Sequence, residues 1–112
     1  METTTQVTFR HMPRSPALEA DILEKVEHLQ RYHERIIACR VAVEAPNHHH
    51  RKGGLFRVLV TIALPGEIIV TSHTHHDDHA HEDAYVAVRD AFLAARRQLE
   101  EQVHRRHAHD AP

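Results

Sequence analysis

Residues 55–70 read LFRVLVTIALPGEIIV and contain the clearest structural pattern in this chain of 112 residues. Every second residue from Phe56 to Leu64 is apolar, which is the period of a strand with one buried face. Pro65 and Gly66 then form a turn signal, and residues 68–70 begin another apolar run. The stretch therefore predicts two consecutive strands joined by a tight turn.

Two more strands are predicted before this pair. Residues 36–45 alternate in the same way, with Cys39, Val41 and Val43 toward one face. This strand extends the pair to a three-stranded antiparallel meander. Residues 6–11 alternate more loosely, and we interpret them as a short opening strand.

Two helices are predicted from apolar residues that recur at steps of three and four. The first spans about residues 16–34, with Ser15 as its N-cap and Pro16 at the first helical position. The second begins at Glu82 or Asp83 and runs to about residue 106. Their apolar stripes are Leu18, Ile22, Val26, Leu29 and Tyr32 in the first helix, and Tyr85, Val88, Phe92, Ala95, Leu99 and Val103 in the second.

The element order is thus β-α-β-β-β-α, which predicts an α+β fold. A four-stranded sheet with both helices packed on one face buries all the apolar stripes at once and leaves the other face open. The length suits one domain, placed at residues 1–106, followed by a frayed tail at 107–112.

Composition excludes several classes of protein. The single cysteine, Cys39, rules out an internal disulfide framework and a Cys-rich zinc module, and a buried, inert thiol is expected there. No apolar run approaches the roughly 20 residues of a membrane span, and the start of the chain lacks a secretory signal, so a cytoplasmic protein is expected. Glycines are too few for a phosphate loop, and no spacing supports a catalytic triad. We therefore predict no enzymatic activity and no cofactor.

Charge is unevenly distributed, although the formal net charge is only −2. Residues 3–15 and 45–57 contain bases and no acid, residues 84–109 hold five arginines against three acids, and the first helix is acidic. RNA binding needs cations grouped on one surface. The candidate phosphate contacts are Arg10, Arg51, Lys52, Arg89, Arg96, Arg105 and Arg106. The alternative for each of them is a surface base that is solvated or ion-paired. For Arg105 and Arg106 the alternative is also a favourable interaction with the dipole at the end of the second helix.

An ordered set of residues, over about 6–106, matches the pattern of one known family. The first helix and its exit contribute Ala17-Leu18, Lys25, Leu29, Tyr32 and Arg35-Ile36. The turn and the second helix contribute Gly66-Glu67-Ile68, Asp83-Ala84-Tyr85, Ala87, Asp90 and Arg97-Gln98-Leu99. On these residues the chain resembles the short form of the ribosome hibernation-promoting factors, or ribosome-associated inhibitors, of the sigma-54 modulation (S30EA) type.

The resemblance implies a fold like the double-stranded RNA-binding domain, with a different strand count. It also implies binding to the small ribosomal subunit (16S rRNA) between head and body, over the mRNA and tRNA positions, so that the ribosome is held idle. No membrane or DNA partner is expected. The match adds Lys25 and Arg97 to the candidate RNA contacts, although Asp21 is placed to pair with Lys25. The near-neutral net charge departs from the basic balance of the family.

The 14 histidines suggest two further hypotheses. His73, His75, His79 and His81 lie close together around two aspartates, and such side chains can bind zinc or nickel. A His-rich metal-binding protein is therefore one alternative function, and a stress protein acting through a protein partner is another. Histidines beside the RNA-binding bases also predict RNA affinity that rises as the pH falls toward 6.

Overall fold

The computed structural model describes residues 4–45, 56–73 and 83–110, with side chains for all of these except residues 73 and 106–110. Six elements follow one another along the chain. They are β1 (Thr4–Arg10), α1 (Pro16–Tyr32), β2 (Ala38–Glu44), β3 (Arg57–Leu64), β4 (Glu67–His73) and α2 (Ala84–Asp110). The predicted order β-α-β-β-β-α is confirmed.

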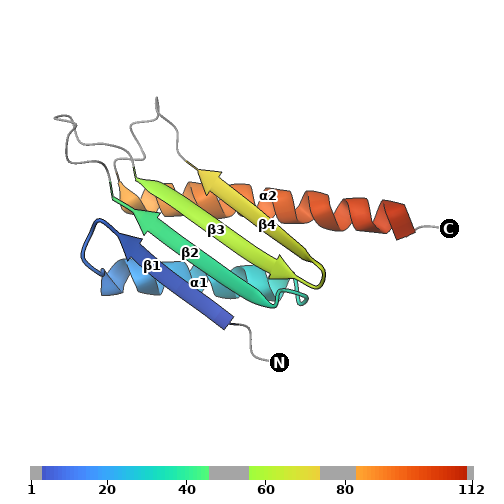
Figure 1. Ribbon diagram of the computed structural model, residues 1–112, viewed down its shortest axis with the longest axis horizontal. Helices are drawn as coiled ribbons and strands as arrows, with labels where there is room; N and C mark the ends of the chain where they lie inside the picture. Colours follow the sequence, from blue (N-terminus) through green and yellow to red (C-terminus); the bar gives the residue numbers. More distant parts are fainter. Residues whose placement is uncertain (1–3, 46–55, 74–82, 111–112) are drawn as a thin grey trace.

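The four strands form one mixed sheet in the order β1-β2-β3-β4 (Figure 1). Strands β2, β3 and β4 form the predicted antiparallel meander, with Val41 opposite Val60 and Thr61 opposite Val70. Strand β1 pairs in parallel with β2, with Val7 opposite Val41. The parallel pairing follows from the connection, because α1 crosses back between the two strands and lets both run in the same direction.

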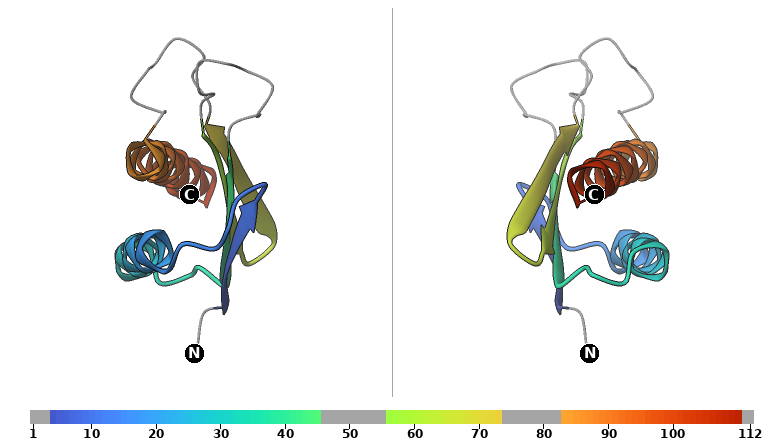
Figure 2. Two further views of the ribbon diagram at one scale, coloured as in Figure 1. Left: turned by 90° about the vertical axis from the view of Figure 1, so that its left-hand side faces the viewer. Right: turned by 90° about the vertical axis from the view of Figure 1, so that its right-hand side faces the viewer.

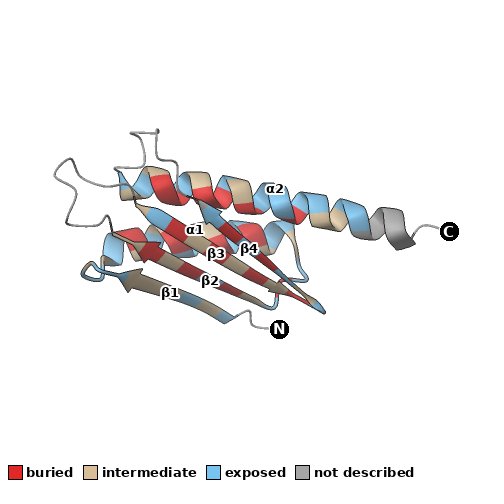
Figure 3. Ribbon diagram, turned by 45° about the horizontal axis from the view of Figure 1, so that its top comes forward, coloured by how far each residue is buried: buried red, intermediate tan, exposed pale blue. Residues whose placement is uncertain are grey.

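Both helices cover one face of the sheet, and the other face is left uncovered (Figure 2). The covered face is built by the inward residues of β2 and β3, which have almost no exposed surface (Figure 3). Val58, Val60 and Ile62 of β3 are completely buried. They pack with the apolar stripes of the helices into a single core, as the alternation in residues 55–64 predicts.

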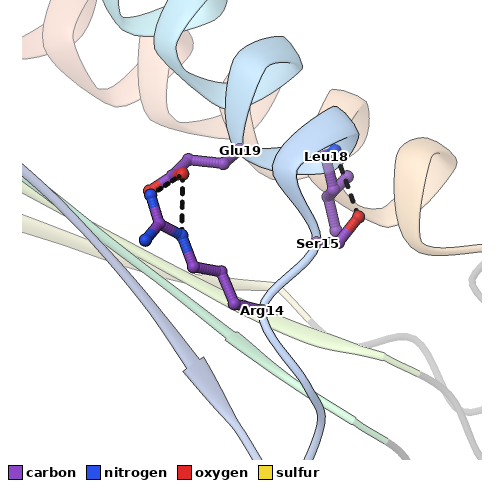
Figure 4. Close-up of polar contacts among 4 residues, drawn as sticks. All are labelled: Arg14, Ser15, Leu18 and Glu19. Atoms are coloured by element: carbon purple, nitrogen blue, oxygen red, sulfur yellow. Dashed lines mark hydrogen bonds and ion pairs between the residues drawn. The ribbon is translucent and has the colours of Figure 1, made fainter.

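Local sequence signals define where both helices begin. The backbone N–H of Leu18 donates to Ser15 Oγ over 3.3 Å, and Pro16 follows the cap, so the predicted N-cap is confirmed (Figure 4). At the start of α2, the N–H of Tyr85 donates to Asp83 Oδ1 over 2.9 Å. These side chains satisfy amide groups that have no partner within the helix.

The structure corrects the predicted burial of two tyrosines. Tyr32 and Tyr85 fall on the apolar stripes in the sequence, yet they are 49% and 46% exposed. Both lie at helix termini, where the ring can stay at the rim of the core with its hydroxyl in water.

The ends of the helices also differ from the prediction. Helix α1 ends at Tyr32 rather than at residue 34, because His33 takes an extended backbone while its N–H still donates to the Leu29 carbonyl. Helix α2 continues to Asp110 rather than ending at 106. Among the residues that the structure describes, no helix is long and apolar enough to cross a membrane.

The difference between the two sheet faces can be tested with a pair of isoleucines. Ile62 is fully buried on the covered face, whereas Ile68 is 67% exposed on the open one. We expect Ile62→Ala to lower the free energy of unfolding by about 2–5 kcal/mol, since it leaves a cavity in the core. Ile68→Ala should change it by less than about 1 kcal/mol. Urea unfolding of both variants measures the difference, and equal losses would contradict the difference in burial between the two isoleucines.

The buried thiol provides a second test of the core. Burial raises the pKa of Cys39 to about 11 from an ordinary value of 9.0, because the charged thiolate is poorly solvated there. At pH 8 the thiolate fraction is therefore about 100-fold lower than in an exposed cysteine. We expect iodoacetamide to alkylate the native protein at least that much more slowly than the urea-unfolded protein. Similar rates in the two states would contradict a buried thiol.

Candidate nucleic-acid interface

A solvent-facing groove of about 240 Å³ runs between α1 and α2. Four nitrogen-bearing side chains line it, together with an apolar floor, and no carboxylate belongs to the lining. The lining consists of Lys25, His28, Leu29, Tyr32, Arg89, Phe92, Leu93 and Arg96. We refer to it as the helix groove. The bases along its rim can contact an anionic polymer, whereas its floor is apolar.

Helical spacing determines where the basic side chains of the groove lie. Arg89 and Arg96 are seven residues apart on α2, close to two turns, and therefore share one face of the helix. Lys25 and His28 are three residues apart on α1 and lie opposite them. Between the two rows, Phe92 is buried and closes the floor. Two helices that each carry a modest number of bases thus form one cationic surface.

The Tyr32 ring of α1 contacts Arg96 of α2 across the groove. The guanidinium carbon of Arg96 lies 4.6 Å from the centroid of the Tyr32 ring, within the range of a cation–π interaction. Arg96 Nε also donates to Glu100 Oε1 over 3.2 Å. Sequence periodicity assigned Tyr32 to the core, so its role beside Arg96 was missed. Only the packing of α1 beside α2 reveals it.

Lys25 and the two groove arginines each have a carboxylate neighbour outside the lining. Lys25 Nζ lies 3.1 Å from Asp21 Oδ1, and Arg89 lies 3.0 Å from Asp90 Oδ1. The Arg89 side chain is largely exposed, and exposed pairs of this kind contribute only about 0.2–1 kcal/mol. A phosphate group can therefore share Arg89 with its carboxylate neighbour at small cost, whereas the side chains of the Lys25–Asp21 pair are only 28% exposed.

The structure brings together three of the nine predicted RNA contacts, namely Lys25, Arg89 and Arg96. Arg97 is exposed beside Arg96 and forms no ion pair with any described residue, but it does not line the groove. Arg105 lies beyond the groove, 3.9 Å from Glu101.

The remaining candidates do not join the helix groove. Arg10 is exposed on β1, in the lining of a hollow that the helices do not share. Arg51 and Lys52 lie outside the described residues, and so does the side chain of Arg106.

Most of the histidine clusters lie outside the described part of the chain. His73 closes β4, and His75, His79 and His81 fall in the undescribed segment after it. Within residues 4–45, 56–73 and 83–110, no three His, Cys, Asp or Glu residues are grouped to hold a metal ion. The metal site and the pH response therefore stay predictions. Where a histidine pKa is shifted, at His33, burial and then the Arg35 charge lower it, which disfavours protonation.

Two solved structures share this fold at low sequence identity. A ribosomal subunit interface protein from Coxiella burnetii is 20% identical, with a TM-score of 0.71 over 89% of this chain and 97% of that one. The N-terminal domain of Protein Y from Thermus thermophilus is 17% identical, with a TM-score of 0.67 over 89% of this chain and 98% of that one. No curated protein matches this sequence.

The sequence itself matches a protein family over nearly its whole length. The model of the family described as sigma 54 modulation protein / S30EA ribosomal protein matches residues 5–107. This range covers the six elements except the first residue of β1 and the last three residues of α2, and it includes the complete helix groove. The chain therefore belongs to the sigma 54 modulation protein / S30EA family of ribosome-associated proteins.

Proposed function

We propose that this protein is a cytoplasmic hibernation factor that binds the small ribosomal subunit between head and body. There it occupies the mRNA and tRNA positions and holds the ribosome idle. The helix groove contacts phosphate groups of 16S rRNA through Lys25, Arg89 and Arg96. Inhibition by occupancy needs no bond to be made or broken, so no catalytic group is assigned.

The helix groove is the observation that carries this proposal. Cations from two helices converge there, and no carboxylate lines it. Arginine binds phosphate through several N–H donors in a fixed plane, and lysine adds a point charge. Clustering of this kind on one surface produces nucleic-acid affinity even in a protein whose net charge is close to zero.

The aromatic side chains indicate which part of the RNA is contacted. Three of the five are phenylalanines that belong to the core or pack against it. Of the two exposed tyrosines, Tyr32 lies beneath Arg96 and Tyr85 is outside the groove lining. Stacking of unpaired bases needs free aromatic faces. The groove therefore binds the RNA backbone, and its affinity depends on RNA shape and salt more than on sequence.

Charge reversal in the groove tests this contact. We expect Arg89→Glu combined with Arg96→Glu to weaken binding to purified small subunits at least tenfold, because two charge-assisted phosphate contacts are lost. The dependence of log affinity on log salt should become shallower by about two. Co-sedimentation with small subunits over a potassium chloride series measures both quantities.

Arg14 and Arg31 provide the matched control. Both are exposed and paired with a carboxylate, and neither lines the groove. Arg14→Glu combined with Arg31→Glu changes the net charge by the same amount, yet it should alter the affinity only slightly. Equal losses in the two double variants would show that net charge alone governs binding. No binding by the wild type at any salt concentration would refute the proposed function.

Competition with ligands of the subunit tests the occlusion mechanism. We expect small subunits loaded with mRNA and initiator tRNA to bind the protein at least tenfold more weakly than empty subunits, since the sites overlap. The protein should also depress translation in a cell-free system. Simultaneous, full-affinity binding of protein, mRNA and tRNA would show that it acts elsewhere on the subunit.

A further inference from the structure

The uncovered face of the sheet contains a second cationic hollow, of about 230 Å³. Strand alternation directs one row of side chains from β1, β2 and β3 into it. Both helices lie on the other side of the sheet (Figure 2). Gln6 of β1 lies opposite Arg40 of β2, which lies opposite Thr61 of β3. Thr8 and Arg10 line the same hollow from β1. We refer to it as the sheet hollow.

Among residues 4–45, 56–73 and 83–110, the two arginines of the sheet hollow form no ion pair. Arg10 and Arg40 are exposed, and neither has a carboxylate partner among the described residues. Glu44 lies opposite Arg10 in the strand register, yet its carboxylate forms no ion pair with Arg10 and does not line the hollow. In this respect the hollow differs from the helix groove, where carboxylates accompany Lys25 and both arginines.

The donors in this hollow suit phosphate oxygens. The two guanidinium groups can each donate several N–H bonds, and the hydroxyls of Thr8 and Thr61 and the amide of Gln6 add neutral donors. No aromatic residue lines the hollow, so it offers no surface on which a base could stack. This is the chemistry of contact with a sugar–phosphate backbone without sequence readout.

We infer that the sheet hollow is a second RNA-binding site, which takes the phosphate backbone of an RNA strand through Arg10 and Arg40. The identity of that strand as ribosomal RNA rests on the proposed function, but the site itself does not. Two cationic sites on opposite sides of the sheet allow one domain to contact two backbone segments at the same time. Such a domain is suited to a position between two RNA surfaces.

Short RNA tests the second site directly in the full chain. An oligouridylate of about six nucleotides is long enough to fill one site of this kind. Calorimetric titration should give two oligomers per wild-type protein at low salt. Arg10→Gln combined with Arg40→Gln should reduce this to one, and so should Arg89→Gln combined with Arg96→Gln in the helix groove.

Arg14→Gln combined with Arg31→Gln is the control, because it removes the same charge from paired arginines outside both sites. It should retain two bound oligomers. If the Arg10 and Arg40 variant also retains two, with unchanged affinity for each, the sheet hollow is not an RNA site. All substitutions are at exposed side chains, so circular dichroism should show that each variant is folded.

Binding to small subunits separates this inference from the proposed function. We expect the Arg10 and Arg40 variant to bind subunits about tenfold more weakly than the control variant. If the wild type binds subunits and the two variants bind them equally, the sheet hollow does not contact ribosomal RNA, and the proposed function stands. If the wild type does not bind subunits, but the Arg10 and Arg40 variant binds one oligouridylate fewer than the wild type, the site stands and the proposed function fails.

Discussion

Burial of one face of the sheet is the constraint on which the rest of the structure depends. Val58, Val60 and Ile62 are fully buried, so this face of β3 has to be covered along its length. One helix is too narrow to cover four strands, and two helices must therefore lie next to each other. The helix groove is a direct consequence, because its walls are the outward sides of two helices held together by the core beneath them.

The same constraint separates the charges in a way that total composition conceals. The apolar positions of each helix are used for the core, so the charged positions are displaced to the outer side. On α1 these positions are mostly acidic, and on α2 they include Arg89, Arg96, Arg97 and Arg105. A chain with a formal charge of −2 can therefore present a cationic groove, provided that the acids lie outside its lining.

The open face follows from the same alternation that fills the core. Each inward residue of β2 is flanked by outward ones, so burying Cys39 and Val41 leaves Arg40 on the exposed side. This face has no packing role that restricts its side chains, which frees them for a partner. Its arginines form no ion pair within the described part of the chain, whereas those of the helix groove have carboxylate neighbours. RNA binding at the two surfaces should therefore differ in its salt dependence.

Local pattern was sufficient to predict much of this protein. The alternation of apolar residues in the strands and their spacing of three and four in the helices depend only on neighbours in the chain. The same is true of the caps at Ser15 and Asp83 and of the turn at Gly66. Together these signals predicted the element order and the covered sheet. The positions that the sequence could not settle depend on contacts between distant segments. Tyr32 looks like a core residue until α2 places Arg96 over its ring. Arg10 and Arg40 are 30 residues apart, and only the parallel pairing of β1 with β2 brings them into one hollow. Periodicity determines which side of its own element a residue occupies, whereas the packing of elements against one another decides which residues share a surface.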